Sequence, residues 1–241
     1  MAAAPLFPHM LPILRGDGSP VQDFRSAADW RSLKDGTPDG SRADAEPITT
    51  QSFLAEEHHR AYGRPWIMGR YYVDQLISLG VRPGERVLDL GCGAGRVGIW
   101  LIPVLEPERY CGVDNHLRSL VAFAGYENVL HRLWPRRPRL MLSDAFEVEG
   151  FGQRFDVVLD LFVLAHLDEA VQRTVLRRIA GVCAPKARLI TLQPPADSLD
   201  AMAALGFALT EEHQVAYPLL EGAENPKHVS DHWRVFERVI N

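Results

Sequence analysis

The chain has 241 residues, of which 46% are hydrophobic and 24% are charged, and its formal net charge is −5 at pH 7. This balance predicts one globular α/β domain with an appendage, and it gives no electrostatic reason to expect a nucleic acid as partner. The three cysteines, Cys92, Cys111 and Cys183, are too widely spaced for a CxxC metal pair or a disulfide framework. The apolar start of the chain lacks a basic region and is broken by prolines, unlike a signal peptide. We therefore expect a cytoplasmic protein that does not enter a membrane.

Residues 1–49 are predicted to form a loosely structured N-terminal arm. Within them, Gly16–Pro47 is rich in Gly, Pro, Asp and Ser and carries only isolated apolar residues, so no packed core is expected there. The main domain is expected to span residues 50–241. Its first part, residues 50–80, is predicted to be helical and to act as a lid or cap, and Pro83-Gly84 stops the chain before the first strand.

The run VLDLGCGAG, Val87–Gly95, joins a buried strand to a loop of nearly bare backbone. Its first residues are apolar and partly β-branched, which is typical of a strand covered on both faces. Gly91, Gly93 and Gly95 leave three loop positions without a Cβ, which permits unusual dihedrals and close approach by a ligand. A helix is expected over Val97–Leu101, so unpaired amides and the positive end of a helix dipole would meet at this loop. The pattern predicts an anionic group there.

A second strand is predicted over Arg109–Asp114. Its last residue lies about twenty residues beyond the glycines, where an acidic side chain can bind ribose hydroxyls. Gly93, Gly95 and Gly98 also match the GxGxxG pattern of dinucleotide-binding loops. From these residues alone, NAD and S-adenosylmethionine both remain candidate cofactors.

The rest of the chain alternates helices with apolar strands, as a doubly wound sheet requires. The predicted elements are a helix at Leu117–Leu133, strands at Arg139–Leu142, Phe155–Phe162 and Ala187–Leu192, a helix that Asp168 can cap, a short helix at Ala201–Leu205, and final strands at Phe207–Val215 and Trp233–Ile240. The last two strands, joined by a polar loop, predict a terminal β-hairpin.

The segment DLGCGAG, Asp89–Gly95, resembles the first motif of the class I S-adenosylmethionine-dependent methyltransferases. The order of five β-α units and a terminal hairpin resembles the same family, from Trp66 to the end of the chain. The resemblance implies a Rossmann-like, doubly wound α/β fold whose seven-stranded sheet ends in an antiparallel hairpin. It also implies an enzyme that transfers the methyl group of S-adenosylmethionine. One departure is the segment Ala184–Ala187, which replaces the family's usual Pro-Gly-Gly turn, so a turn of another type is expected there.

The resemblance implies roles for the glycine loop and for the end of the next strand. Asp89 would contact the methionine amino group of the cofactor, directly or through water. Gly91, Gly93 and Gly95 would pass under its methionine and ribose parts, and Asp114 would accept both ribose hydroxyls. The alternative roles are ordinary turn glycines and a solvated aspartate at a strand end.

Two later strand ends complete the cofactor site that the resemblance implies. Asp144 and Ala145 match the segment that bounds the adenine, with a helix cap as the alternative role for Asp144. The segment Asp160–Phe162 should line the face where the methyl group is transferred, and Asp160 is expected to contact the cofactor. Leu161 and Phe162 fit a packed core equally well.

His166 follows the fourth strand, where many small-molecule members of the family carry a histidine near the transferring methyl. We predict that His166 is the general base for a hydroxyl acceptor and that Asp160 is the second candidate for this role. The alternative for His166 is a packed histidine bonded to backbone. The predicted substrate is a small molecule, a metabolite or a sugar.

Other functions remain open from the residues alone. The chain could be an NAD-dependent oxidoreductase, or a catalytically silent module of the same fold that binds a cofactor or a partner. A nucleic acid substrate is disfavoured, because the basic run Arg132–Arg139 is typical of a solvated loop and the residues after the fourth strand lack the signature of amino-methylating nucleic-acid enzymes. No metal site is expected, since the histidines of the terminal hairpin have no carboxylates at a ligand spacing. His58 and His59 are expected to be solvated or part of the lid.

Overall fold

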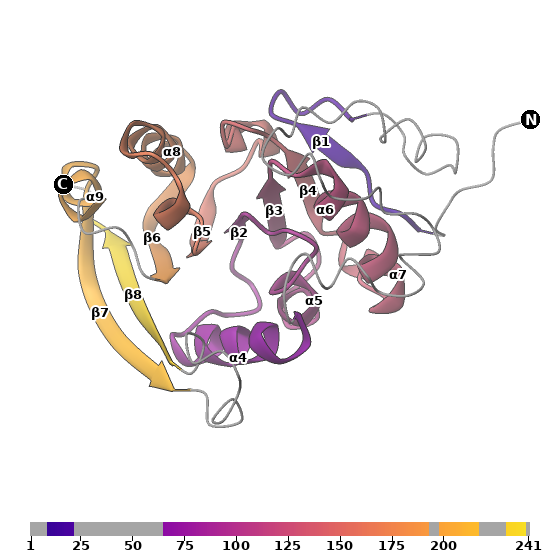
Figure 1. Ribbon diagram of the computed structural model, residues 1–241, viewed down its shortest axis with the longest axis horizontal. Helices are drawn as coiled ribbons and strands as arrows, with labels where there is room; N and C mark the ends of the chain where they lie inside the picture. Colours follow the sequence, from indigo (N-terminus) through magenta and orange to yellow (C-terminus); the bar gives the residue numbers. More distant parts are fainter. Residues whose placement is uncertain (1–8, 22–64, 193–197, 217–229, 240–241) are drawn as a thin grey trace, which may run out of the picture.

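The computed structural model describes residues 9–21, 65–192, 198–216 and 230–239, and these residues build one eight-stranded sheet (Figure 1). The strands in chain order are β1 Ile13–Arg15, β2 Val87–Leu90, β3 Tyr110–Asp114, β4 Arg139–Leu142, β5 Phe155–Leu161, β6 Cys183–Leu192, β7 Phe207–Ala216 and β8 Ser230–Arg238. In space they follow the order β1-β4-β3-β2-β5-β6-β8-β7.

The strands from β1 to β6 run parallel to their neighbours, whereas β8 is antiparallel to both β6 and β7. The predicted α/β fold, doubly wound and closed by an antiparallel terminal hairpin, is therefore confirmed. The strand count differs from the seven that the resemblance implied. The described residues contain one more strand, because β1 extends the sheet beyond β4.

Helices cover both faces of the sheet. They are α4 Pro65–Ser78, α5 Gly98–Leu101 and α6 Leu117–Val121 over one face, and α8 Glu169–Val182 and α9 Ser198–Ala204 over the other (Figure 1). Successive strand residues alternate between the two hydrophobic layers, so Val87 packs in the layer of α4 to α6 while Leu88 and Leu90 pack in the layer of α8 and α9. Asp89 shares the face of Val87 and is buried with it.

The helix predicted over Leu117–Leu133 is present, but its hydrogen bonding changes along its length. After α6 comes a π-helical segment, η1 Ala122–Glu127, and then α7 Asn128–Leu130. The carbonyl of Ala124 in η1 accepts a hydrogen bond from outside the helix, from the amide of Leu11 at 3.0 Å. A π-helical insertion of this kind often marks a place where a helix serves another contact, and here it holds the N-terminal segment.

Residues 9–21, inside the predicted N-terminal arm, pack on the domain. Met10, Ile13 and Val21 are buried, and β1 pairs in parallel with β4. This differs from the expectation of a loosely structured arm over residues 1–49, because these apolar side chains gather at the sheet edge that they cover. The rest of the arm, and the predicted lid up to residue 64, lie outside the described residues.

Two local predictions are modified by the structure. Asp168 occupies the N-cap position of α8, but its side chain makes no cap hydrogen bond, and it is the Asp168 carbonyl that accepts a bond from the amide of Gln172 at 2.8 Å. The segment Ala184–Ala187 belongs to β6 and forms a bulge there, with Lys186 at a φ of 62° and a shift in the register with β5. The family's usual turn is thus replaced by a strand irregularity.

The first testable prediction concerns the contact between the N-terminal segment and the short helix η3 Val148–Phe151. A Cβ at Gly150 would lie 2.0 Å from the carbonyl oxygen of Gly16, which is backbone and cannot rotate away. Gly150→Ala should therefore lower the free energy of unfolding by about 1–3 kcal/mol, as overpacking does. Urea denaturation measures the change.

Gly181 in α8 supplies a matched control, because a Cβ there would meet nothing within 4 Å. Gly181→Ala should be neutral or stabilising by about 0.5–1 kcal/mol, since alanine is the better helix former. Equal stabilities for the two variants would show that the N-terminal segment does not pack on η3 in solution.

Candidate active site

The candidate site lies where the strand order reverses. The chain passes from β2 to β3 and then β4 on one side, whereas β5 pairs with the other side of β2. Ligands of open α/β sheets bind at such a switch point, beyond the carboxyl ends of the strands. The loop after β2 and the turn after β5 touch there, because a Cβ at Gly91 would lie only 2.3 Å from Cγ2 of Val163.

The three glycines of the loop all have left-handed backbone, with φ values of 63° at Gly91, 55° at Gly93 and 90° at Gly95. Their surroundings differ. A Cβ at Gly95 would lie 2.7 Å from the ring of Phe123, just as one at Gly91 would strike Val163, whereas the nearest atom to a Cβ at Gly93 is 4.0 Å away. Gly91 and Gly95 are thus required by packing, and the open side of the loop is at Gly93.

Asp114, at the end of β3, ties this loop to the next strand. Its Oδ2 accepts a hydrogen bond from the amide of Gly93 at 2.8 Å, and its Oδ1 accepts one from the amide of His116 at 2.7 Å. Burial raises the pKa of Asp114, while these two amide bonds act to lower it. For the Gly93 amide, the anionic group predicted at the loop is therefore the carboxylate of Asp114, a part of the protein itself.

Asp89 lies beneath the loop and is only 3% exposed. Its Oδ2 accepts a hydrogen bond of 2.6 Å from the hydroxyl of Tyr110. Burial raises the pKa of Asp89 to about 7, with the hydrogen bond from Tyr110 lowering it and the charge of Asp114 raising it further. Two acidic side chains are thus held close together in a poorly solvated place.

Two aromatic residues that the sequence reasoning missed support the loop from below. The rings of Tyr110 and Phe123 meet edge to face, with centroids 6.0 Å apart. A Cβ at Gly98 would lie 2.3 Å from Phe123 and 2.9 Å from the Tyr110 hydroxyl. The glycine at position 98 was noticed only as part of GxGxxG, although a glycine in a helix beside two aromatic residues is also a packing signal.

Asp160, at the end of β5, is fully buried and uses both carboxylate oxygens within the protein. Oδ1 accepts the amides of Val163 at 3.0 Å and Leu164 at 2.9 Å, and Oδ2 accepts the hydroxyl of Thr191 at 2.8 Å. Burial raises the pKa of Asp160, against the effect of these bonds. The bonds fix a turn in which Phe162 has a φ of 74°, a costly conformation for a non-glycine residue.

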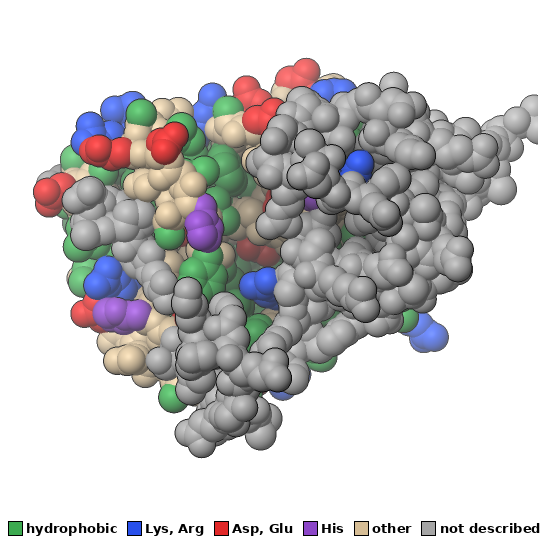
Figure 2. All heavy atoms as spheres, viewed as in Figure 1, with side chains coloured by type: hydrophobic (Ala, Val, Ile, Leu, Met, Phe, Trp, Pro, Cys, Tyr) green, Lys and Arg blue, Asp and Glu red, His purple; other side chains and the backbone are tan. Residues whose placement is uncertain are grey.

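The remaining predicted residues lie on the surface of the described structure. His166 is exposed and ends the 3₁₀ turn η4 Leu164–His166 directly after this strained turn. Asp144 and Ala145 are exposed after β4, and the next helix, η3, has no side-chain cap hydrogen bond, so Asp144 does not cap it. On the face seen in Figure 2, hydrophobic side chains gather in a central hollow with charged side chains around it.

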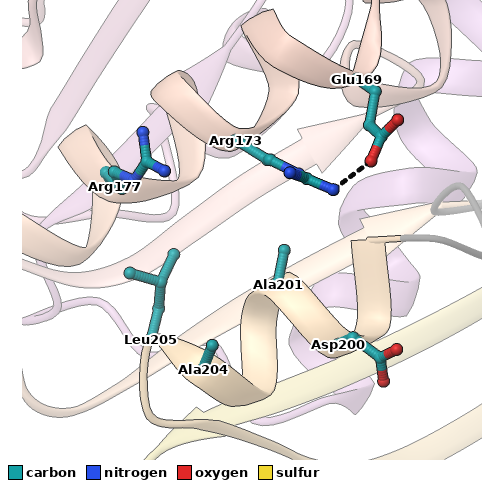
Figure 3. Close-up of a pocket in the computed structure, with 7 residues that line it drawn as sticks. All are labelled: Glu169, Arg173, Arg177, Asp200, Ala201, Ala204 and Leu205. Atoms are coloured by element: carbon teal, nitrogen blue, oxygen red, sulfur yellow. Dashed lines mark hydrogen bonds and ion pairs between the residues drawn. The ribbon is translucent and has the colours of Figure 1, made fainter.

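A separate groove of about 540 Å³ lies between α8 and α9. Its lining residues, drawn in Figure 3, are Glu169, Arg173, Arg177, Asp200, Ala201, Ala204 and Leu205. Glu169 and Arg173 are ion-paired across one turn of α8. None of these residues belongs to the predicted site, so the groove is a distinct feature of the helical flank.

Within the described residues, no group of three or more His, Cys, Asp or Glu side chains could hold a metal ion. In the same part of the chain, no helix combines the length and apolar character needed to cross a membrane.

Residues 88–189 match the family model described as a methyltransferase domain. This match begins in β2, includes the glycine loop and the ends of β3, β4 and β5, and ends in β6. These residues thus match a methyltransferase domain, and the predicted resemblance to the class I S-adenosylmethionine-dependent methyltransferases is confirmed. The predicted enzyme class is confirmed with it, as is S-adenosylmethionine as the cofactor of that class.

Solved structures of methyltransferases share this fold. Magnesium protoporphyrin IX methyltransferase from Synechocystis PCC 6803, crystallised with bound S-adenosylmethionine, is 18% identical over 82% of this chain and 88% of its own, with a TM-score of 0.56. The N-methyltransferase NodS from Bradyrhizobium japonicum WM9, in complex with S-adenosyl-L-homocysteine, is 16% identical over 88% and 98%, with a TM-score of 0.53. The CcbJ methyltransferase from Streptomyces caelestis is 16% identical over 74% and 98%, with a TM-score of 0.56.

The second testable prediction concerns the turn that Asp160 fixes. Thr191→Val removes the hydroxyl donor to a buried carboxylate, so the free energy of unfolding should fall by about 1–3 kcal/mol. Thr174→Val is the matched control, since that hydroxyl bonds a carbonyl on the exposed side of α8 and its loss should change stability by no more than about 0.5 kcal/mol. Urea denaturation of both variants would refute the assignment if the two losses were equal.

Proposed function

We propose that this chain transfers the methyl group of S-adenosylmethionine to a hydroxyl group of a small molecule, a metabolite or a sugar. The observation that carries the proposal is the pair of buried acids, Asp89 and Asp114, at a glycine loop where a Cβ at Gly93 would meet no described atom nearer than 4.0 Å. S-adenosylmethionine carries a sulfonium and an ammonium group, which such acids attract. NAD would bring a diphosphate to the same loop, and the two carboxylates would repel it.

The residues present fit this cofactor. We propose that Asp114 accepts the ribose hydroxyls with the lone pairs that its amide bonds leave, and that Asp89 faces the amino group. A Cβ at Gly93 would have its nearest described atom 4.0 Å away, so this position allows the cofactor to approach the backbone. Asp144 and Ala145, exposed beside Asp114 at the end of β4, are proposed to bound the adenine.

His166 is proposed as the general base. It lies on the turn that touches the glycine loop through Val163, and its side chain is exposed. Asp160 lies at the end of β5, but it is fully buried and already accepts three hydrogen bonds. We therefore assign Asp160 to holding the turn, and we do not retain it as a base or as a direct contact of the cofactor.

The main task of the protein is to align the acceptor with the methyl group, since the bound cofactor supplies that group in an electrophilic form. Holding the acceptor in line with it can contribute about 7–11 kcal/mol in favourable cases. His166 would take the proton of the acceptor hydroxyl as the oxygen attacks, a step typically worth about 10²–10⁴-fold in rate. Phe162 and Leu161, both partly buried beside this turn, would exclude water from the acceptor.

A nitrogen acceptor is the second candidate, because one protein of the same fold is described as an N-methyltransferase. An amine that is already deprotonated needs no general base. The two candidates therefore differ in what they require of His166.

The third testable prediction concerns cofactor binding. By isothermal calorimetry, S-adenosylhomocysteine should bind and NAD should not. Asp114→Asn should raise the dissociation constant of S-adenosylhomocysteine about ten- to a hundredfold, because a charged acceptor of buried hydroxyls is lost. Asp200→Asn, at a residue of α9 that lines the separate groove, is the control and should leave the dissociation constant within about twofold of wild type. A change under twofold in Asp114→Asn would remove this residue from the site.

The fourth testable prediction concerns the base. On a hydroxyl acceptor identified by release of S-adenosylhomocysteine, His166→Asn should lower turnover by about a hundredfold, with the affinity for S-adenosylhomocysteine and the melting temperature near wild type. His213→Asn, at an exposed histidine of β7, is the matched control and should keep full turnover. Turnover of His166→Asn within a factor of three of wild type would favour a nitrogen acceptor.

A further inference from the structure

Tyr110 is placed to hold Asp89 in one orientation. Its side chain is 1% exposed, and its hydroxyl donates to Oδ2 of Asp89 at 2.6 Å. The Phe123 ring packs edge to face against one side of the Tyr110 ring, so the Tyr110 ring cannot rotate away from Asp89 on that side. A tyrosine in this setting is a rigid donor to a single carboxylate oxygen.

The register of the sheet explains why this bond can form. Gly112 is the residue of β3 directly opposite Asp89, and Tyr110 is two residues before it on the same face. A Cβ at Gly112 would lie 3.2 Å from Cε1 of Tyr110 and 2.7 Å from Sγ of Cys92. The absence of a side chain at Gly112 therefore lets the Tyr110 ring lean across to Asp89.

The two oxygens of Asp89 are used differently. Oδ2 has the Tyr110 hydroxyl, whereas Oδ1 receives no hydrogen bond from any residue that the structure describes. Oδ1 is not one of the fully buried unpaired side-chain atoms of the described residues, so this oxygen is accessible and can accept a bond from a ligand. The asymmetry indicates that one oxygen belongs to the scaffold and the other to a cationic partner.

We propose that Tyr110 is a positioning residue that holds Oδ2 of Asp89, so that Oδ1 faces the ammonium group of S-adenosylmethionine. The inference rests on the proposed function, and it assigns Tyr110 a role that neither the glycine motif nor the strand-end acids indicate. Without the Tyr110 hydroxyl, the pKa of the buried Asp89 carboxylate rises. At a pH where Asp89 is then protonated, its attraction for the ammonium group is lost and binding weakens.

The groups that act on Asp89 come from two elements. Tyr110 and Asp114 are on β3, and the Cys92 thiol lies in the glycine loop. Burial raises the pKa of Asp89 to about 7 even with the Tyr110 bond in place, and that bond lowers it. Removing the bond therefore moves the ionisation of Asp89 to higher pH, and with it the pH above which the ammonium group binds well.

The experiment compares wild type with Tyr110→Phe by calorimetric titration with S-adenosylhomocysteine between pH 6 and pH 8.5. If the ionisation of Asp89 moves up by about one pH unit, the dissociation constant rises about fivefold at pH 7 and less than about 1.5-fold at pH 8.5. Phe123→Leu is the control for loose packing under the same loop. It leaves the bond intact, so its effect on affinity should be the same at every pH.

Two further measurements keep the result clear. In an Asp89→Asn background, where no carboxylate remains to be held, Tyr110→Phe should cause no additional loss and affinity should not vary with pH between 6 and 8.5. In the protein without ligand, a carbon-13 titration of the aspartate carboxyl groups should show the Asp89 midpoint at higher pH in Tyr110→Phe than in wild type. This second readout needs neither cofactor nor turnover.

The outcomes separate the positioning role from the proposed function. Unchanged affinity in Tyr110→Phe at pH 7, or a loss that is equal at all pH values, overturns the positioning role and leaves the methyltransferase assignment standing. An unmoved Asp89 midpoint in the ligand-free titration overturns it as well. Wild-type protein that fails to bind S-adenosylhomocysteine at any pH overturns the proposed function and this inference together.

Discussion

The carboxylate of Asp114 connects the two elements on which the rest of the site depends. Its bond to the Gly93 amide fixes the glycine loop to the end of β3, and its bond to the His116 amide fixes the start of the following segment. A charged acceptor is stronger in this role than a neutral one, because hydrogen bonds to an ionised group are about twice as strong. The two bonds therefore fix the shape of the loop within the protein itself, and a loop that is ordered in advance reduces the ordering cost of binding a ligand.

The three buried aspartates at neighbouring strand ends show that position alone does not set a role. Asp160 accepts three hydrogen bonds from its own scaffold, more than either of the other two aspartates accepts from the described residues. Asp114 accepts two amides and Asp89 accepts one hydroxyl, so each keeps lone pairs that the described residues do not use. The number of donors already present separates Asp160 from the two aspartates that are proposed to bind the cofactor, and that number depends on packing across strands.

Much of the fold could be predicted from the sequence because its signals are local. The buried strands, the glycine loop and the terminal hairpin each follow from a short run of residues, and β4 has the predicted bounds. The edge strand β1 could not be found this way, because Met10, Ile13 and Val21 show no periodicity and are buried only by the sheet that they join. The same limit hid Tyr110 and Phe123, because Tyr110 bonds Asp89 and Phe123 packs against Gly95, and both partners lie far from them in the sequence.

The glycines of the loop show the same contrast most clearly. All three are predicted to lie under the cofactor. Among the described residues, a Cβ at Gly91 would strike Val163 and one at Gly95 would strike Phe123, whereas the nearest atom to one at Gly93 is 4.0 Å away. The contact of Gly91 with Val163 matters beyond the loop, because Val163 belongs to the turn that Asp160 holds and that leads to His166. The glycine loop thus contacts the turn that leads to the proposed base, and a change at Gly91 would shift that turn.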